Sequence, residues 1–518
     1  MKRLSVPALM FLAMSCAPPP ADEVSRPAIT FSTDEVFDAG AIPAYAGDHQ
    51  DVYAHIDANQ AGHLAQLQRW LRQPSVSAQN LGIAEMAAMV RDDYRSLGCQ
   101  EAELVPTSGH PGVWASCDYG APKTLVVYMM YDVQPVEPSD WRSPPFAAEV
   151  IDHDLGRVLM ARGATNQKGP ERAFLNALQS ILAVRGTLPV NLMFVAEGEE
   201  ELGSPNYPEV IAPYADRLRQ AAGVFFPFNS QDAEGRVGMS LGVKGILYFE
   251  LEAVGGAQGG PTRAEIHGSY KAITDAPAWR LVQALSSLTT PDGNTIRVPG
   301  YYDAIRAPND EEQRLFNAIV ADWPNREEGV REVLGVERWI DGMEGRATQE
   351  ELLFNTTLNI DGIVGGYTGE GVKTILPHRA LAKVDSRLVP DQHPDSQLTL
   401  IRQHLDALGF TDITVRKLSG YPPAQTSVDA PLVQAAIGVF NKHGTPPVVA
   451  PRLAGSAPYY VFTDLGLPMV AAGMGFGTGA HAPNEIMLVE PAAGSPVAGL
   501  AAIEKFYVDL LYALAEAP

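Results

Sequence analysis

The chain has 518 residues, of which 46% are hydrophobic and 19% are charged, a balance typical of a globular protein rather than a disordered one. At about 150 residues per domain, this length predicts two to four domains. The formal net charge is −23. Because so acidic a surface repels phosphate backbones, the composition argues against a nucleic-acid partner.

Residues 1–16 have the pattern of an export signal. Two basic residues precede an apolar stretch, residues 4–14, that is too short to span a membrane. The sequence AMSC then resembles a bacterial lipobox, so we expect cleavage before Cys16 and lipidation of its sulfur; a plain secretory signal or an internal cysteine is the alternative. The interpretation is an exported protein, anchored by lipid alone to the periplasmic or cell-surface side of a bacterial membrane, with residues 17–48 as a tether.

Two further cysteines, Cys99 and Cys117, complete the three in the chain. An exported protein reaches an oxidising compartment, where two cysteines can form a disulfide. The sequence does not show whether their Cβ atoms face each other, so the pairing stays open.

Residues 49–242 alternate between helical and buried-strand patterns. Apolar residues recur at helical spacing, and three short apolar runs are typical of buried strands. We predict helices near 64–71, 83–97 and 170–181 and strands at 124–130, 190–196 and 223–228. This alternation predicts an α/β fold in which helices flank a mostly parallel sheet. Ligands bind at the carboxyl ends of such strands, where Asp132, Glu200, Glu201 and Asn229 follow the three predicted strands.

The pattern changes after Gly245. From 246 to 253, apolar residues at the odd positions alternate with Ile, Tyr and two Glu at the even positions. This alternation indicates an antiparallel strand with two different faces. Further helices and strands follow up to residue 415, after which the α/β pattern resumes. We therefore predict an α+β insertion, residues 243–415, within an α/β domain made of residues 49–242 and 416–518.

Six motifs occur in one order along the chain. They are YDVQPVEPSDWRSPPF (131–146), ARGATNQKGP (161–170), EGEEELGS (197–204), RLVPDQ (387–392), AGSAP (454–458) and HAPNE (481–485). Together they resemble the dinuclear zinc metallopeptidases that include carnosinases, bacterial dipeptidases, aminoacylase and carboxypeptidase G. The resemblance covers about residues 50–515 and implies a catalytic α/β domain interrupted by an α+β lid, residues 243–415, through which two copies form a homodimer.

The motifs depart from the family at the metal ligands. The family's HYDVQP reads MYDVQP here, which places Met130 where the family has a metal-binding histidine. The family's SDDKG reads TNQKG, so the bridging aspartate becomes Asn166. The aspartate at the end of a later strand aligns with Asn229. Of five ligands implied by the resemblance, only Glu201 and His481 match.

These changes fall mainly on one of the two metal positions. The set of Met130, Asn166 and Asn229 offers neither an anion nor an imidazole, and a thioether suits zinc or manganese poorly. Two divalent ions would also bring more positive charge into the cleft than Glu201, the one carboxylate ligand of the family that is kept, can neutralise. We therefore expect at most one divalent ion, zinc or manganese, at Glu201, His481 and weakly Asn166; a site with no functional metal is the alternative.

The resemblance also assigns catalytic roles. Glu200 stands at the position of the general base, which takes a proton from the attacking water. Asp132 normally orients the histidine ligand, and the alternative role here is that of a structural hydrogen-bond acceptor. His267 resembles the lid histidine that reaches the partner subunit's site and polarises the scissile carbonyl; an ordinary surface or interface histidine is the alternative.

Substrate contacts are implied in the lid and near the C-terminus. Arg387 resembles the lid arginine that clamps a substrate carboxylate, alongside His267; a structural salt bridge is its alternative. Gly455 and Ser456 resemble the loop that cradles the C-terminal end of the substrate, and their alternative is a helix N-cap.

The resulting hypothesis is an exported hydrolase acting on the amide bond of dipeptides or N-acyl amino acids. One alternative is a catalytically inactive relative that binds a peptide or amino-acid-like ligand, and another is acyl-transfer or condensation chemistry in the same cleft. The pentapeptide from Gly238 to Gly242 matches a nucleophile elbow, which requires a helix directly after the serine. An antiparallel strand is predicted there instead, so a serine hydrolase is disfavoured.

Overall fold

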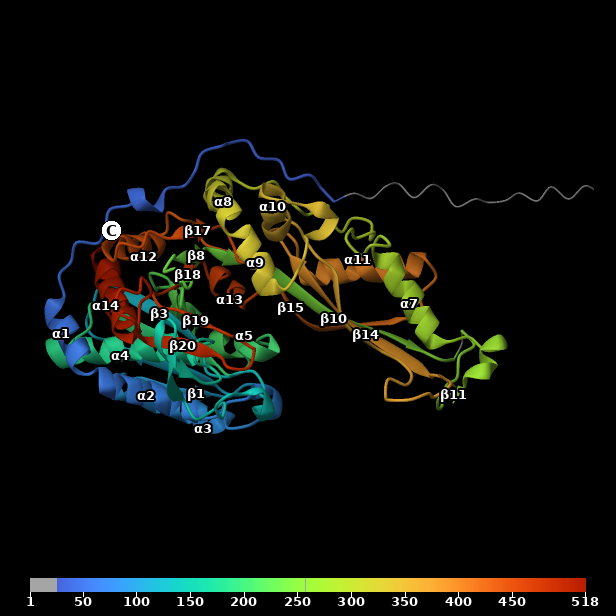
Figure 1. Ribbon diagram of the computed structural model, residues 1–518, viewed down its shortest axis with the longest axis horizontal. Helices are drawn as coiled ribbons and strands as arrows, with labels where there is room; N and C mark the ends of the chain where they lie inside the picture. The colour runs from blue at the N-terminus through green and yellow to red at the C-terminus, as the bar shows by residue number, and fades with distance from the viewer. Residues whose placement is uncertain (1–25, 257) are drawn as a thin grey trace, which may run out of the picture.

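The structure is a computed structural model that describes residues 26–256 and 258–518 (Figure 1). The predicted signal segment 1–16, including Cys16, and the first part of the predicted tether, residues 17–25, lie outside the described residues. No helix within the described residues is both long and apolar enough to cross a membrane.

A six-stranded sheet forms the centre of the first domain, in the order β1-β2-β6-β3-β7-β18. Strands β6, β3, β7 and β18 run parallel, while β1 and β2 form an antiparallel edge. The predicted α/β fold with a mostly parallel sheet is confirmed. The strands are β1 (Glu101–Val105), β2 (Gly112–Cys117), β3 (Thr124–Met130), β6 (Asn191–Glu197), β7 (Val224–Pro227) and β18 (Met469–Ala472).

Helices cover both faces of this sheet, which explains why β3 is a continuous apolar run. Leu125, Val127 and Met129 face one core, and Val126 and Tyr128 face the other. The first face packs against the larger helices and the second against short ones. The former are α1 (Gln50–Ala58), α2 (Gln60–Arg72), α3 (Ile83–Ser96), α4 (Lys168–Arg185), α12 (Pro431–Lys442) and α14 (Leu500–Glu516); the latter are α5 (Tyr207–Ile211), α6 (Ala215–Leu218) and α13 (Tyr460–Thr463).

A second, antiparallel sheet joins two distant parts of the chain. Its order is β19-β20-β5-β4, made of β4 (Glu149–His153), β5 (Gly156–Met160), β19 (Gly477–Thr478) and β20 (Ile486–Pro491). The pairing of β5 with β20 brings the loop after β5 beside residues 479–485. The ARGATNQKGP and HAPNE motifs therefore meet in space.

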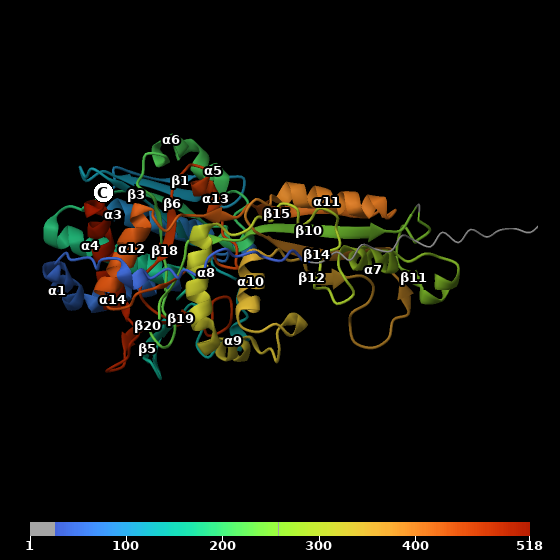
Figure 2. The same cartoon turned by 90° about the horizontal axis from the view of Figure 1, so that it is seen from above.

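The lid is an antiparallel sheet in the order β12-β14-β10-β15. Its elements are β10 (Gly245–Val254), β12 (Asn359–Val364), β14 (Arg379–Leu388), β15 (Thr414–Tyr421), α7 (Pro277–Leu288) and α11 (Pro394–Ala407). Both helices contribute to the core beneath the sheet. Figure 2 shows the lid extending as an arm away from the central sheet. Strand β15 continues to Tyr421, beyond the boundary expected at 415, because its pairing with β10 reaches that residue.

Part of the predicted insertion packs on the first domain rather than in the lid arm. It consists of α8 (Asp310–Asp322), α9 (Glu327–Leu334) and α10 (Arg346–Phe354). Leu315 of α8 enters the core of the first domain, and Phe316 packs with Phe354 of α10. The range 243–415 therefore contains a lid sheet and a separate three-helix segment.

Residues 26–48, the described part of the predicted tether, pack on the protein, first along this segment and then, from residue 39 to 47, against α12. Phe31 stacks on Phe316 with ring centroids 4.9 Å apart. The Asn317 Nδ2 donates to the carbonyl oxygens of Thr33 and Glu35 at 3.0 and 2.8 Å. Phe31 and the carbonyl groups of Thr33 and Glu35 thus have partners on α8. Residues 26–48, called the strap below, therefore pack on the protein and do not form a free linker.

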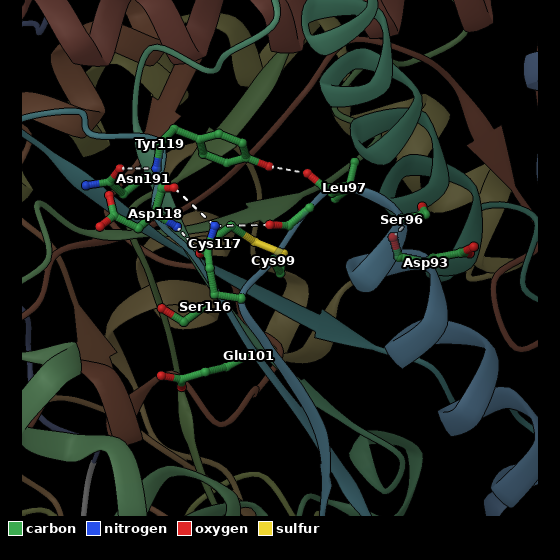
Figure 3. The surroundings of a disulfide bond; sticks show 12 residues. Asp93, Ser96, Leu97, Cys99, Glu101, Ser116, Cys117, Asp118, Tyr119 and Asn191 are labelled. Atoms are coloured by element: carbon green, nitrogen blue, oxygen red, sulfur yellow. Dashed lines mark hydrogen bonds between the residues drawn. A yellow bond between two sulfur atoms is a disulfide. The ribbon is translucent and has the colours of Figure 1, made fainter.

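A disulfide joins Cys99, which precedes β1, to Cys117 at the end of β2 (Figure 3). The hairpin β1–β2 holds the two residues together, since Glu101 pairs with Ser116 in register. Beside the bond, the Tyr119 hydroxyl donates to the Leu97 carbonyl oxygen at 2.6 Å. The pairing that the sequence left open is present, and it ties α3 to the edge of the central sheet.

Candidate active site

Polar side chains gather where three parallel strands of the central sheet end. Met130 is the last residue of β3, and Asn229 follows β7. Glu200 and Glu201 lie in a short 3-10 turn, η4 (Glu200–Leu202), after β6. Because β3, β6 and β7 are neighbours and parallel, these side chains are brought to one edge, as the sequence predicts.

The Glu201 carboxylate is the centre of the site. Gln134 Nε2 donates to one of its oxygens at 2.7 Å and Asn166 Nδ2 donates to the other at 2.8 Å. His481 Nε2 lies 3.2 Å from the same oxygen that Gln134 contacts. The hydrogen bond to Glu201 raises the pKa of the His481 imidazole. Glu201, Asn166 and His481 therefore come together, and the Glu201 carboxylate already has protein partners.

Glu485 fixes the loop that carries Asn166. Its carboxylate accepts hydrogen bonds from the backbone N–H groups of Thr165 and Asn166, both at 2.8 Å, and of Gly163 at 3.0 Å. Arg162 donates to it from its guanidinium at 2.8 Å. A buried carboxylate with four donors is well satisfied, so Glu485 acts as the anchor of this loop.

The second metal position of the family has a different chemistry here. Met130 is buried, and its backbone N–H donates to Glu171 at 2.7 Å. Asn229 donates from Nδ2 to Thr165 Oγ1 at 3.0 Å, while its Oδ1 is buried without a hydrogen-bond partner. Within residues 26–256 and 258–518, no group of three or more His, Cys, Asp or Glu side chains could hold a metal ion. This position does not fit zinc or manganese.

The pair of Glu201 and His481 fits one ion better. Two ligands of a tetrahedral zinc ion, each about 2.0–2.1 Å from it, lie about 3.3 Å apart. The Glu201 and His481 atoms are separated by 3.2 Å, and the His481 side chain is 57% exposed and therefore open to solvent. A carboxylate and an imidazole are suitable ligands, and the Asn166 amide could add an oxygen if it turned. The donor set is thus compatible with one ion held by few protein ligands.

Asp132 positions the turn that carries the two glutamates. Its two carboxylate oxygens accept hydrogen bonds from the backbone N–H groups of Glu200 and Glu201, each at 3.1 Å. Burial, together with the charge of Glu201, raises the pKa of Asp132 to about 7. This geometry gives Asp132 a structural role in holding η4, beside any role in catalysis.

The Glu200 carboxylate remains open to a ligand. Among the residues that the structure describes, none donates a hydrogen bond to it. Burial, followed by the charges of Glu201 and Asp132, raises its pKa well above the ordinary value. A carboxylate with free lone pairs and a raised pKa is suited to take a proton from water.

Arg387 and Ser456 meet across the join between the lid and the first domain. Arg387 donates to Ser456 Oγ at 3.0 Å and to Asp385 Oδ1 at 3.1 Å. Gly455 precedes Ser456, and a Cβ atom at this glycine would meet no atom within 4 Å. Arg387 also lines a cavity of about 570 Å³. The predicted carboxylate clamp and the predicted loop are therefore adjacent, with open space beside them.

Tyr421 lies across β10 from Arg387, since both residues pair with Ile246 in the lid sheet. Burial raises the pKa of its hydroxyl, the charge of Glu200 raises it further, and the charge of Arg387 opposes the rise. Both charges therefore act on one buried side chain. A Cβ atom at Gly203, which follows η4, would lie 3.2 Å from Ser419 Oγ of the same strand β15. The lid sheet therefore adjoins the edge that carries the glutamates, and this reacting edge and the clamp form two halves of one region.

His267 is the predicted residue that the single chain does not bring to this region. It ends β11 (Ile266–His267) near the tip of the lid, far from the central sheet in Figure 1. Its Nδ1 lies 2.8 Å from Ser269 Oγ, and the side chain is exposed. Ser240 is likewise no nucleophile elbow, because β8 (Gly238–Ser240) is followed by strand β9 (Gly242–Val243) rather than by a helix.

Sequence reasoning did not single out Gln134, Thr165 and Glu485. Gln134 and Glu485 lie inside the quoted YDVQP and HAPNE motifs, so the signal was present but carried no assignment. Thr165 precedes Asn166 and holds Asn229. Their roles depend on which groups hydrogen-bond in space, which spacing along the chain does not reveal.

Both the sequence and the fold have known relatives. Residues 127–495 match the model of peptidase family M20/M25/M40. A Beta-Ala-His dipeptidase of Rattus norvegicus is 28% identical over 426 residues, which cover 76% of this chain and 82% of the relative. A Cys-Gly metallodipeptidase of Candida albicans is 26% identical over 376 residues, covering 69% and 74%. The structure of an M20 family metallo-carboxypeptidase from Sulfolobus solfataricus is 35% identical with a TM-score of 0.75, covering 88% of this chain and 98% of the other.

Proposed function

Because the chain belongs to peptidase family M20/M25/M40, we propose that it hydrolyses the amide bond of dipeptides or N-acyl amino acids. The observation that carries this proposal is the open Glu200 carboxylate beside Glu201 and His481, with the Arg387–Ser456 clamp on the adjoining lid sheet. The names of the dipeptidase relatives support the same substrate class.

Each half of the region has its own task. Arg387, held by Asp385 and Ser456, binds the carboxylate of the substrate. Glu200 takes a proton from the attacking water and delivers it to the leaving amine. A single zinc or manganese ion at Glu201, His481 and Asn166 would supply Lewis-acid polarisation of the scissile carbonyl. Asp132 keeps Glu200 and Glu201 in place through their backbone N–H groups.

A second candidate function is ligand binding without turnover. The observation that favours it is the Glu201 carboxylate, whose oxygens already contact Gln134, Asn166 and His481. Protein donors in these places can substitute for a metal ion. In that case the clamp binds a peptide or amino-acid-like ligand that is not cleaved.

One experiment separates the two functions. The purified chain is incubated with dipeptides and N-acyl amino acids, with zinc or manganese or with a chelator, and released amino acid is measured. Turnover that requires the metal supports hydrolysis. Ligand binding by calorimetry without turnover under any condition supports the binding relative.

Replacing Arg387 by Met should weaken the binding of ligands with a free carboxylate by about 10- to 100-fold, the usual range for a charged hydrogen bond. Their C-terminal amides should bind equally to both forms. The measurement is calorimetric titration of each ligand pair. The matched control is Arg379→Met, which removes an arginine from the other end of β14. Equal losses for carboxylates and amides would contradict the clamp.

We also propose a homodimer formed through the lid. Strand β12 is the edge of the lid sheet and all six of its residues are exposed. Ile363 and Val364 are 55% and 54% exposed, unusual for apolar residues on a free edge. A second copy would cover this edge and could carry the partner's His267 toward the reacting region.

Ile363→Lys is expected to convert the dimer to a monomer, because a charge on a paired edge must be desolvated. Light scattering gives the mass of each form. Val333→Lys on α9, where Val333 is 88% exposed, is the control and should stay dimeric. A wild-type monomer at high concentration would remove the role of His267.

Export and lipid anchoring at Cys16 complete the proposal. The signal-like pattern of residues 1–16 supports it. The disulfide between Cys99 and Cys117 independently supports export, since such bonds persist in oxidising compartments.

A further inference from the structure

A second cavity, of about 590 Å³, opens at the reacting edge. Its walls on the first domain include Asn229, Gly455 and Tyr459, and its walls on the three-helix segment include Ile319, Leu352 and Leu353. The helices α8 and α10 therefore close a space that begins beside Asn229, just after the end of β7. The strap formed by residues 26–48 packs on α8 and adds support to that wall.

The charged groups around this cavity are largely neutralised. Arg236 pairs with Asp232 at 2.7 Å, and the buried Arg452 pairs with Glu312. Asp322 and Arg326 contribute one charge of each sign from the end of α8 and the start of α9. The remaining lining is mainly apolar and includes Phe228, Met239, Val448, Ala450 and Leu453. Such a lining favours an apolar group over a carboxylate or an ammonium group.

The cavity lies next to the catalytic groups. Asn229 contacts Thr165, and the adjacent Asn166 contacts Glu201, so a chain of short contacts joins the cavity wall to the centre of the site. Tyr459 lies within electrostatic reach of Glu200, whose charge adds to the effect of burial in raising the tyrosine pKa. The cavity that contains Arg387 shares Leu352 and Ala454 with this one. A ligand with its carboxylate at Arg387 could therefore place its other end here.

We propose that this cavity binds the acyl group, or the N-terminal side chain, of the substrate and selects a bulky apolar group there. The inference rests on the proposed function, because it assigns the second half of the same ligand. It predicts N-acyl amino acids with medium-length acyl chains, or dipeptides with a large apolar N-terminal residue, as the preferred class.

A ligand series tests the cavity without relying on turnover. N-acetyl-, N-hexanoyl- and N-decanoyl-L-alanine are titrated calorimetrically into the full chain in the presence of a chelator. Affinity should rise about three- to fourfold for each methylene that enters the cavity. Equal affinity for the three ligands would overturn the proposal.

Gly238 offers a position at which a side chain can be added to the cavity wall. It lines the cavity, and a Cβ atom at this position would meet no atom within 4 Å. Gly238→Leu should weaken N-decanoyl-alanine by at least about tenfold and leave N-acetyl-alanine unchanged. The control is Gly329→Leu, at a helical glycine that also has open space and does not line the cavity. Equal losses for both ligands in Gly238→Leu would contradict the assignment.

Failure of the cavity and failure of hydrolysis give different results. Binding that depends on acyl length, without any turnover, would contradict the proposed hydrolysis and support the proposed role of the cavity. Turnover that does not depend on acyl length, with Gly238→Leu behaving like wild type, would contradict acyl binding in the cavity and support hydrolysis.

Discussion

Glu200→Gln should lower kcat for amide hydrolysis by about 10²- to 10⁴-fold while ligand affinity changes little. Glutamine has nearly the same shape as glutamate but does not accept a proton from water at neutral pH. Since no described residue donates a hydrogen bond to the Glu200 carboxylate, the substitution breaks no contact that supports the fold. The measurements are steady-state rates with the substrate found in the panel and calorimetric affinity for the same ligand.

The control for this variant is Glu490→Gln, which alters an exposed glutamate paired with Arg157 on the second sheet. It should leave both rate and affinity unchanged. If Glu200→Gln retained wild-type turnover, Glu200 would not be the base. If it lost ligand binding and turnover together, a binding role for Glu200 would replace the catalytic one.

Restoring three family ligands should create a second metal position. The variant carries Met130→His, Asn166→Asp and Asn229→Asp, which supply one imidazole and two carboxylates at the candidate site. With two ions, kcat should rise at least about a hundredfold, since Lewis-acid help is worth several kcal/mol. Elemental analysis should find one more zinc ion per chain than in wild type.

The same variant has a readout besides activity. Two added carboxylates near Glu201 and Asp132 repel each other without metal, so the variant should melt below wild type in chelator. Zinc at about 100 times its Kd should raise its Tm by roughly 5 °C, more than for wild type. The control, Met130→Leu with the same two aspartates, has equal charge but no imidazole and should gain less. Equal zinc responses in all forms would contradict the assignment of these positions.

The central sheet could be predicted from the sequence because a strand that is buried on both faces is apolar at every position. The run from Thr124 to Met130 is apolar throughout, and both of its faces are indeed covered by helices. The strap was harder to predict. Its structure depends on Phe31 finding Phe316 far along the chain, and no local pattern encodes that contact. The three-helix segment was not predicted for the same reason, because Leu315 packs in the core of the first domain, far away along the chain.

The site was predictable where strand ends and motifs fix position. Glu201, Asn166 and His481 come together as expected, since β6 brings Glu201 to the edge of the central sheet and the pairing of β5 with β20 joins the loops of Asn166 and His481. Hydrogen-bonding roles were not predictable. Whether Glu201 meets a metal ion or the Gln134 amide depends on side-chain directions that arise only in the folded chain.

The metal content of the chain that starts at Ala17 tests most directly whether Glu201 and His481 hold a single ion. The protein is incubated with zinc and manganese, dialysed, and analysed by elemental mass spectrometry. We predict no more than one ion per chain, lost in Glu201→Ala and in His481→Ala but retained in Met130→Leu. Two ions per chain, or one ion that survives both Glu201→Ala and His481→Ala, would contradict it.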